Sequence, residues 1–226
     1  HIPSQVGTIQ PAEEVGRIAG EHDILYLLDA CQSVGQVPLD TQKLHCDMLT
    51  GTGRKYLRGP RGTGFLYVRK QVLQRLDPPF VDLHSATWLD EERFAFRDDA
   101  RRFENWETFV TGKIGLGAAV DYAMAIGLEN IRARIESLAL TQRNHVKILP
   151  GMQVYEPTER LSGIVTFSLA GVDPMQLRIR LRDSRINISV AKRANAVLDL
   201  GRRGTGDVCR VSLHYFNTGE QIEQFI

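Results

Sequence analysis

The residues best suited to chemistry lie in a glycine-rich, basic stretch, residues 50–64, which holds five glycines and one proline. Its four cations are Arg54, Lys55, Arg58 and Arg61. Glycine lets a backbone approach a ligand closely, while hydroxyls, amides and guanidinium groups bind phosphate oxygens. The stretch therefore predicts a site for a phosphate-bearing ligand; a solvated turn and contact with an RNA backbone are the alternatives. It is not a P-loop, because GxxxxGK[ST] is absent, and Tyr56 stands where GxGxxG needs its third glycine.

Lys55 offers more than a positive charge. A lysine partly desolvated beside Arg54 is shifted toward the neutral amine, which attacks carbonyls and forms Schiff bases. Asp29 follows the apolar run of residues 24–28, and open α/β sheets place ligand groups at the carboxyl ends of such strands. Pyridoxal phosphate (PLP) needs a lysine for its aldehyde, a carboxylate for its pyridine nitrogen and a phosphate cup. Lys55, Asp29 and the neighbourhood of Thr52 and Arg54 supply these three groups.

The elements around these residues follow from hydrophobic spacing. Residues 24–28 predict a parallel strand buried on both faces, and two further strands, 47–50 and 65–68, flank the glycine-rich stretch. Between 78 and 104 the periodicity is lost, which predicts a long surface loop with at most one irregular turn. The helices predicted in this part of the chain are 11–20, 71–76, a buried small-residue helix at 112–125, and 128–145.

The pattern changes in the last third of the chain. Strands are predicted at 152–155, 164–169, 186–190 and 208–213. One helix opens at Asp173 and Pro174, as N-cap and first helical residue, and a last helix begins at Thr218. We expect an α/β domain over 1–135, with a mainly parallel sheet, followed by a small α+β domain over 136–226.

Composition excludes several classes of protein. The 226 residues carry 28 Lys and Arg against 27 Asp and Glu, so no overall field attracts nucleic acid or an anionic membrane surface. Three cysteines without CxxC pairing suit a reducing compartment, and neither a signal peptide nor a membrane-spanning run is present. The six histidines show no HxxxH or HExxH spacing, so no metal site is expected.

Three motifs together resemble the class V aminotransferase family, which includes cysteine desulfurases and selenocysteine lyases on the aspartate-aminotransferase-like fold (fold type I). They are HIPSQVGTIQP at 1–11, DACQSVGQ at 29–36 and DMLTGTGRKYLRGPRGTGFLYV at 47–68. The resemblance continues through GLGAAV at 115–120 and CRVSLHYFNT at 209–218. It implies a PLP enzyme that acts on an amino acid, whose small C-terminal domain follows the later part of a large PLP-binding domain.

The resemblance also implies roles for single residues of this chain. Lys55 would form the internal aldimine. The other cofactor contacts would be Asp29 at the pyridinium nitrogen, Gln32 at the phenolic oxygen, and Thr52 and Arg54 at the phosphate. Arg54 stands where many relatives carry His, and a guanidinium fork should strengthen phosphate binding. Ser4 stands where some relatives carry an Asn that helps hold the phenolic oxygen, and Arg210 would clamp the substrate carboxylate.

One departure bears on the reaction. Desulfurases of this family carry a nucleophilic cysteine between the strands near Ile186 and Arg210, and the corresponding residues of this chain, 189–207, contain none. We therefore rank transamination or lysis of a C–S or C–Se bond above cysteine desulfuration or amino-acid epimerisation. A non-catalytic anion-binding or assembly protein on the same fold is the alternative from another class.

The resemblance further implies a homodimer, and we expect a cytoplasmic protein with neither nucleic acid nor membrane as partner. The first motif, at His1, resembles a segment from the middle of the family's sequences. We therefore expect these residues to be the later part of a longer chain.

Overall fold

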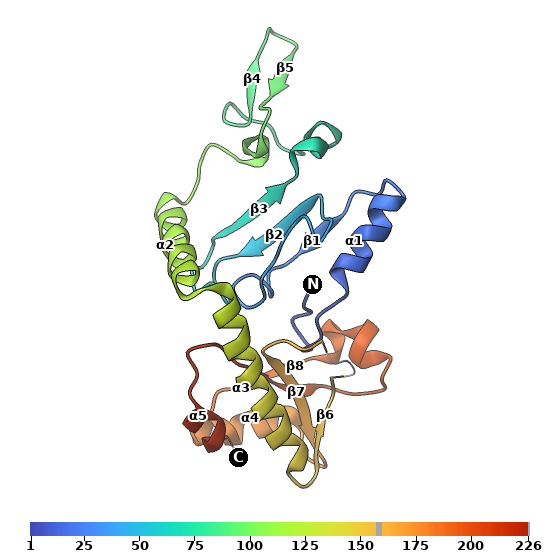
Figure 1. Cartoon of the computed structure of the whole chain (residues 1–226), viewed down its shortest axis with the longest axis vertical. Helices are drawn as coiled ribbons and strands as arrows, with labels where there is room; N and C mark the ends of the chain where they lie inside the picture. The colour runs from blue at the N-terminus through green and yellow to red at the C-terminus, as the bar shows by residue number, and fades with distance from the viewer. Residues whose placement is uncertain (157–159, 226) are drawn as a thin grey trace. The chain divides into compact units, whose positions relative to one another are not determined.

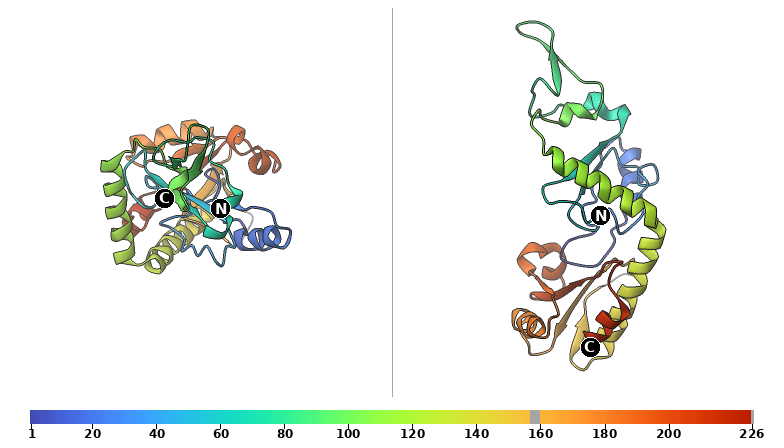
Figure 2. Two further views of the ribbon diagram at one scale, coloured as in Figure 1. Left: turned by 90° about the horizontal axis from the view of Figure 1, so that it is seen from above. Right: turned by 90° about the vertical axis from the view of Figure 1, so that its left-hand side faces the viewer.

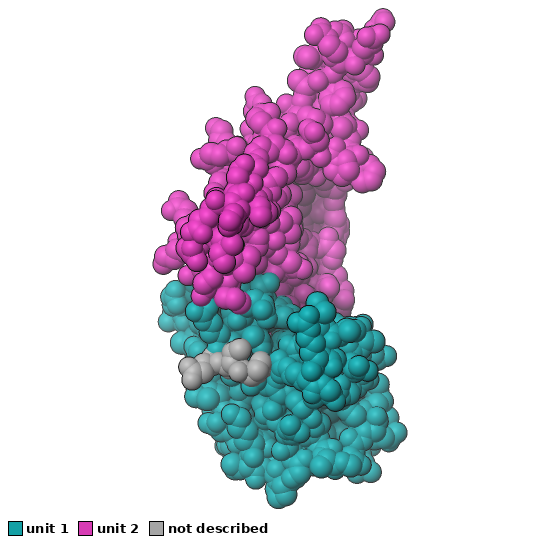
Figure 3. Space-filling view, turned by 90° about the vertical axis from the view of Figure 1, so that its right-hand side faces the viewer, with its two compact units in different colours: residues 1–10, 35–38, 126–226 teal, residues 11–34, 39–125 magenta. Residues whose placement is uncertain are grey.

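The computed structural model describes residues 1–156 and 160–225. They group into two compact units, which are coloured separately in Figure 3. We call residues 11–34 and 39–125 the N-terminal unit, and residues 1–10, 35–38 and 126–226 the C-terminal unit. The domain boundary predicted between 135 and 136 stays a prediction.

A three-stranded sheet in the order β1-β2-β3 forms the centre of the N-terminal unit. β1 (Leu27–Asp29) pairs in parallel with β2 (Met48–Thr52), and β2 pairs antiparallel with β3 (Gly64–Val68). Helix α1 (Ala12–Glu21) precedes β1 and packs through Ala12 on a core that includes Leu28 and Leu49. The predicted strands and helix are confirmed. Burial of β1 on both faces is wrong for the described residues, because Leu28 is buried while half of Leu27 is exposed.

The segment between β3 and α2 is more ordered than predicted. A 3-10 helix, η1 (Lys70–Arg75), takes the place of the expected α-helix. The long loop contains an antiparallel hairpin, β4 (Ala86–Trp88) with β5 (Phe94–Phe96), and a second 3-10 helix, η2 (Ala100–Phe103). In Figures 1 and 2 the hairpin extends away from the three-stranded sheet of its unit.

A single carboxylate ties the two ends of this hairpin segment together. Asp82 accepts hydrogen bonds from the backbone N–H groups of His84 and Ser85 at its start, and from the N–H of Trp106, 2.7 Å away, at its end. These donors lower the pKa of Asp82 to about 2, the Trp106 N–H contributing most. Hydrophobic spacing predicted a loop here. The contacts that stabilise this segment are polar and local, and such contacts leave no periodic pattern of apolar residues in the sequence.

Helix α2 (Val110–Ile126) confirms the predicted helix but not its burial. Only Gly112 and Ala123 are buried, whereas Ile114 and Met124 are largely exposed. The expectation came from apolar composition all around the helix, and no other described segment covers that surface.

A four-stranded antiparallel sheet in the order β6-β7-β9-β8 forms the C-terminal unit. The strands are β6 (Met152–Val154), β7 (Ile164–Leu169), β8 (Ser189–Ala191) and β9 (Val208–Ser212). Helices α3 (Leu128–Ile148), α4 (Pro174–Asp183) and α5 (Gly219–Gln224) cover one face (Figure 1). The short helices η3 (Arg193–Asn195) and η4 (Val197–Gly201) lie between β8 and β9.

Local signals in this unit predicted the starts of its helices correctly. The Asp173 side chain caps α4 by accepting hydrogen bonds from the N–H groups of Met175 and Gln176. Thr218 and Gln221 form a capping box at the start of α5. The distant segments 1–10 and 35–38 could not be assigned to this unit from sequence; Gln36, for example, accepts a hydrogen bond from the N–H of Gly163 at 2.9 Å.

Candidate active site

Asp29 is the last residue of β1 and lies opposite Thr50 in the parallel pairing with β2. Its Oδ1 accepts a hydrogen bond from the backbone N–H of Cys31 at 2.9 Å. This donor is the main cause of a pKa below the ordinary range for aspartate, and the charge of Lys55 acts in the same direction. Asp29 is therefore a fixed carboxylate, ionised at neutral pH, at the carboxyl end of a parallel strand.

A tight turn follows and positions Gln32. The N–H of Ala30 donates to the carbonyl oxygen of Thr50 at 2.9 Å, and the N–H of Ser33 donates to that of Ala30 at 2.8 Å. Gln32 is 7% exposed, so its amide is held by its surroundings instead of moving freely in solvent. The structure thus keeps Gln32 beside the strand end that carries Asp29.

The glycine-rich stretch leaves β2 and returns as β3. At its neck, the N–H of Gly53 donates to the carbonyl oxygen of Thr63 at 2.9 Å, and the Thr52 hydroxyl donates to the same oxygen at 3.3 Å. A Cβ atom added at Gly53 would lie 2.2 Å from Thr63 Oγ1, which is closer than atoms can approach. A larger residue at this position would displace the side chains of Thr63 and of Leu116, whose Cδ1 would lie 2.9 Å from the added Cβ.

Lys55 lies at the tip of this loop, between an exposed residue and two buried ones. Arg54 is exposed, whereas Tyr56 and Leu57 are each 6% exposed and anchor the loop in the unit. The carbonyl oxygen of Lys55 accepts a hydrogen bond from the N–H of Arg58 at 2.9 Å. Arg58 has φ 62°, and its guanidinium lies 5.6 Å from the centre of the Tyr122 ring on α2.

The structure brings Asp29, Cys31 and Lys55 together. Lys55 acts electrostatically on both other side chains: it lowers the pKa of Asp29 and opposes the rise in the pKa of Cys31. Burial is the main cause of the raised Cys31 pKa, and the neighbouring Asp29 carboxylate adds to it. Cys31 is thus kept as a neutral thiol beside the ionised carboxylate of Asp29.

Ser4 and Arg210 belong to the C-terminal unit. Arg210 on β9 donates from Nε and Nη2 to Ser212 Oγ, at 3.0 and 2.9 Å, and from Nη1 to the carbonyl oxygen of Ser4 at 2.5 Å. Ser4 therefore contacts Arg210 through its backbone. Sequence reasoning missed Ser212, which orients the guanidinium; its position two residues after Arg210, on the same face of a strand, was the available signal.

The side chains of the N-terminal unit fit PLP. A carboxylate with a lowered pKa matches a protonated pyridine nitrogen, and a half-buried lysine amine lies within its electrostatic reach. Thr52 and exposed Arg54 lie close together in the glycine-rich stretch, and a hydroxyl and a guanidinium are groups that bind phosphate oxygens. Among residues 1–156 and 160–225, no cluster of three or more His, Cys, Asp or Glu side chains could hold a metal ion. In the same residues no helix is long and apolar enough to cross a membrane.

Comparisons with known proteins give similar sequences and similar structures. Residues 1–225 match the family model of the class V aminotransferases. A probable cysteine desulfurase of Methanothermobacter thermautotrophicus is 31% identical over 229 residues, which cover 99% of this chain and 56% of the relative. The chain thus spans about half the length of the curated relatives it matches.

Solved structures share the fold. The apo structure of a cysteine desulfurase from Thermococcus onnurineus NA1 matches with a TM-score of 0.92 and 28% identity, over 100% of this chain and 56% of that one. The cystine C-S lyase C-DES, solved with its product cysteine persulfide, matches with a TM-score of 0.84 and 23% identity over 99% of this chain and 57% of that one. At that identity the second likeness shows the fold alone.

Proposed function

Because the chain belongs to the class V aminotransferase family, we propose that it forms the lysine-bearing part of a PLP-dependent enzyme that acts on an amino acid. The reaction is transamination or lysis of a C–S or C–Se bond. The observation that carries the proposal is the ionised Asp29 at the end of β1, together with half-buried Lys55 in the loop that follows β2, whose charge acts on that carboxylate.

Each proposed residue has one task. When bound, PLP supplies an electron sink that stabilises negative charge at the substrate α-carbon. Asp29 keeps the pyridine nitrogen protonated, because its carboxylate stays ionised at neutral pH. Gln32 donates to the phenolic oxygen, and Thr52 and Arg54 bind the phosphate. Lys55 would hold the cofactor through its aldehyde, and its side-chain amine would act as the general base that takes the substrate α-proton.

The substrate carboxylate is assigned to the C-terminal unit. Arg210 presents a planar guanidinium whose orientation Ser212 fixes from the same strand. Such a fork suits bidentate binding of a carboxylate. Ser4, whose carbonyl oxygen accepts from Arg210, supports the guanidinium through its backbone, while its side chain is proposed to reach the phenolic oxygen.

A cofactor assay tests Lys55. Protein incubated with PLP should show an absorbance band at about 420 nm, and borohydride reduction should attach the cofactor covalently to the peptide that contains Lys55. Lys55→Ala should lose both signals, and Asp29→Asn should keep the covalent attachment while losing turnover. Lys43→Ala, which removes an exposed lysine of the same unit, is the matched control. A band that persists in Lys55→Ala would show that another residue binds the aldehyde.

Loss of a β-sulfur group is favoured over persulfide formation by the absence of cysteine from residues 189–207. A β-lyase converts cysteine and water to pyruvate, ammonia and sulfide. A desulfurase transfers the sulfur to a protein thiol and leaves alanine. We expect pyruvate without a protein persulfide. Alanine accompanied by a persulfide on Cys31 would instead establish desulfuration, and an absence of turnover in protein with bound cofactor would favour a non-catalytic role.

We also propose a homodimer in the cytoplasm. The hairpin segment of the N-terminal unit exposes Leu83, Trp88, Leu89 and Phe94, and apolar surface of this kind marks protein contacts. A second copy of the chain is the partner we propose, and light scattering measures it directly. The proposed location rests on the three cysteines, which lack CxxC pairing and suit a reducing compartment.

A further inference from the structure

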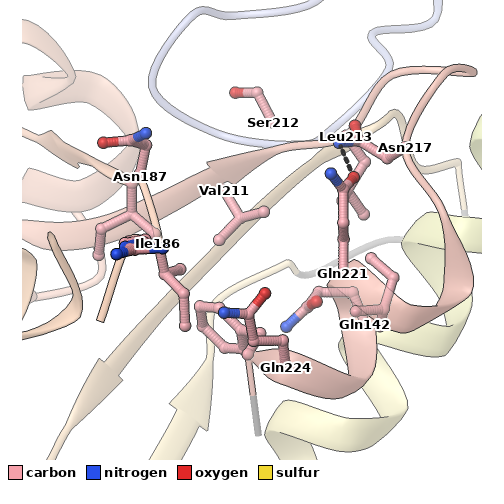
Figure 4. Close-up of a pocket in the computed structure, with 13 residues that line it drawn as sticks. Gln142, Ile186, Asn187, Val211, Ser212, Leu213, Asn217, Gln221 and Gln224 are labelled. Carbon is pink, nitrogen blue, oxygen red and sulfur yellow. Dashed lines mark hydrogen bonds between the residues drawn. The ribbon is translucent and has the colours of Figure 1, made fainter.

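A cavity in the C-terminal unit lies apart from every residue assigned above except Ser212. Its volume is about 250 Å³, and it opens between α5 and the residues that lead from α4 into β8 (Figure 4). We call it the amide cavity, because carboxamides dominate its polar lining: Gln142, Asn187, Asn217, Gln221 and Gln224. No role in PLP chemistry accounts for this concentration of amides.

Gln142 is the most informative of these side chains. It projects from α3 and is 1% exposed, yet its Nε2 has no hydrogen-bond acceptor among the described residues. A buried donor without an acceptor is costly, so native proteins rarely leave one. In Figure 4 the amides of Gln142 and Gln224 face the same space. An acceptor oxygen placed in this cavity would satisfy Gln142.

Two of the other carboxamides, Asn217 and Gln221, already form hydrogen bonds with described residues. Fewer amide donors are therefore available to a ligand. Gln221 Oε1 accepts from Asn217 Nδ2 at 2.9 Å and from the N–H of Thr218 at 3.2 Å, as part of the cap of α5. No such contact joins Gln142 or Gln224 to another described residue. The donors available to a ligand therefore lie on the side of the cavity formed by Gln142 and Gln224.

The charge of the cavity points to an anion. Among the described residues that line it, Arg185 is the only charged one and none is a carboxylate. Arg185 directly follows the C-cap of α4 and has φ 63°, the left-handed conformation that ends many helices; the N–H groups of Arg185 and Ile186 donate to the carbonyl oxygens of Arg182 and Leu181. Its side chain makes no ion pair with any described residue. A cation without an ion-pair partner, beside a buried donor without an acceptor, suits a carboxylate.

The floor of the cavity is apolar. Val211 of β9, with Ile186 and Ile188, forms part of the cluster that also contains Phe225. Because neighbouring residues of a strand point to opposite faces, Val211 lies on the face of the sheet opposite to Arg210. The cavity is therefore not the pocket of the proposed substrate clamp, although both are built on β9.

From these observations we propose that the amide cavity binds a small aliphatic carboxylic acid. Arg185 pairs with the carboxylate, Gln142 donates from Nε2 to one of its oxygens, and the branched hydrocarbon end packs on Val211 and Ile188. This site is separate from the PLP chemistry and does not depend on it.

Binding of 4-methylpentanoate tests the proposal, with its neutral amide, 4-methylpentanamide, as the matched ligand. Calorimetry should give a saturable Kd of about 0.1–5 mM for the acid and binding at least about tenfold weaker for the amide. In nitrogen-edited NMR spectra the side-chain amide signals of Gln142 and Gln224 should move on titration. An ordered water as the only occupant would leave the spectra unchanged, and that result would overturn the proposal.

Two variants locate the binding. Arg185→Gln should remove the preference for the acid over the amide, and because Arg185 is exposed this variant should still fold. Gln142→Leu should weaken binding of both ligands about tenfold, because it removes the buried donor. Arg178→Gln changes another arginine of the same helix region, outside the cavity, and should bind like the unmodified protein. Equal affinity in all three variants would place the ligand elsewhere and refute the assignment.

Discussion

A buried ion pair in the C-terminal unit allows a quantitative test of the structure. Glu156 and Arg143 have side chains that are 2% and 5% exposed, and Nε of Arg143 lies 3.5 Å from Oε2 of Glu156. Glu156 Oε1 also accepts from the N–H of the fully buried Thr166 at 2.7 Å. Glu156→Leu removes both interactions at once and leaves Arg143 charged without its partner carboxylate.

The expected loss of unfolding free energy is about 3–5 kcal/mol, the usual cost of removing one partner of a buried pair. The lost charge-assisted hydrogen bond to Thr166 accounts for about 1.5–3 kcal/mol of it. Glu156→Gln keeps an acceptor for that N–H and should cost less. In the double variant Arg143→Leu/Glu156→Leu no charge remains buried, so its loss should be smaller than the sum of the two single losses.

Urea unfolding followed by far-ultraviolet circular dichroism measures these values, and hydrogen exchange at β7 shows whether the loss is local to the pair. The pH dependence adds a second measurement. Burial is the main cause that raises the pKa of Glu156 above 4.5, so the folded state binds a proton more tightly than the unfolded state. Stability should therefore fall as pH rises from about 4.5 through the raised pKa and then level off, and Glu156→Gln should lack this fall.

Two results would refute this reasoning. One is a loss below about 1 kcal/mol for Glu156→Leu, which is within the range of ordinary surface changes. The other is equal pH dependence in the unmodified protein and in Glu156→Gln.

Three further predictions rest on single contacts. Asp173→Ala removes the acceptor for two N–H groups of α4. The unfolding free energy should fall by about 1 kcal/mol, which corresponds to a fall of about 2–4 °C in Tm. An unchanged Tm would show that the cap is not needed. Gly53→Ala places a Cβ 2.2 Å from Thr63 Oγ1. It should lower the unfolding free energy by about 1–3 kcal/mol, measured by denaturation, and weaken PLP binding, measured by cofactor titration. Unchanged PLP affinity would mean that Gly53 does not shape the phosphate site. Burial raises the pKa of Cys209 to about 11. Iodoacetamide at pH 8 should therefore modify half-buried Cys31 well before Cys209, and mass spectrometry measures the two rates. Equal labelling would contradict the burial of Cys209.

Elements with strong local signals could be predicted from the sequence. Apolar runs marked β2, β3 and β7, and the pair Asp173–Pro174 marked the first residue of α4. Lys55 and Asp29 stood out as candidates for a cofactor lysine and carboxylate because their neighbours, glycines and a strand end, are unusual in type and position. For Asp29 the structure adds the physical cause of its ionised state, the N–H of Cys31.

What could not be predicted depends on contacts that carry no periodic signal. The β4–β5 hairpin is fixed by Asp82 and three donors, which resemble ordinary loop residues in the sequence. Exposure of α2 depends on what else packs near it, which a composition of apolar and small residues does not specify. Ser212, the orienting partner of Arg210, was missed because a serine in a strand has many roles.

The construction of the C-terminal unit from three separate stretches has a consequence for synthesis of the chain. Residues 1–10 are synthesised before the rest of this unit, yet Gly7 and Ile9 pair with Ser162 and Arg160, and Ser4 contacts Arg210, 206 positions away. At ordinary translation speeds they wait for about 10–40 s before the last of these partners exists. During this time Ile2 and Val6, which are both buried in the folded unit, remain exposed. Newly made chains should therefore offer this early stretch to chaperones, and completion of the unit should be the slow step of folding.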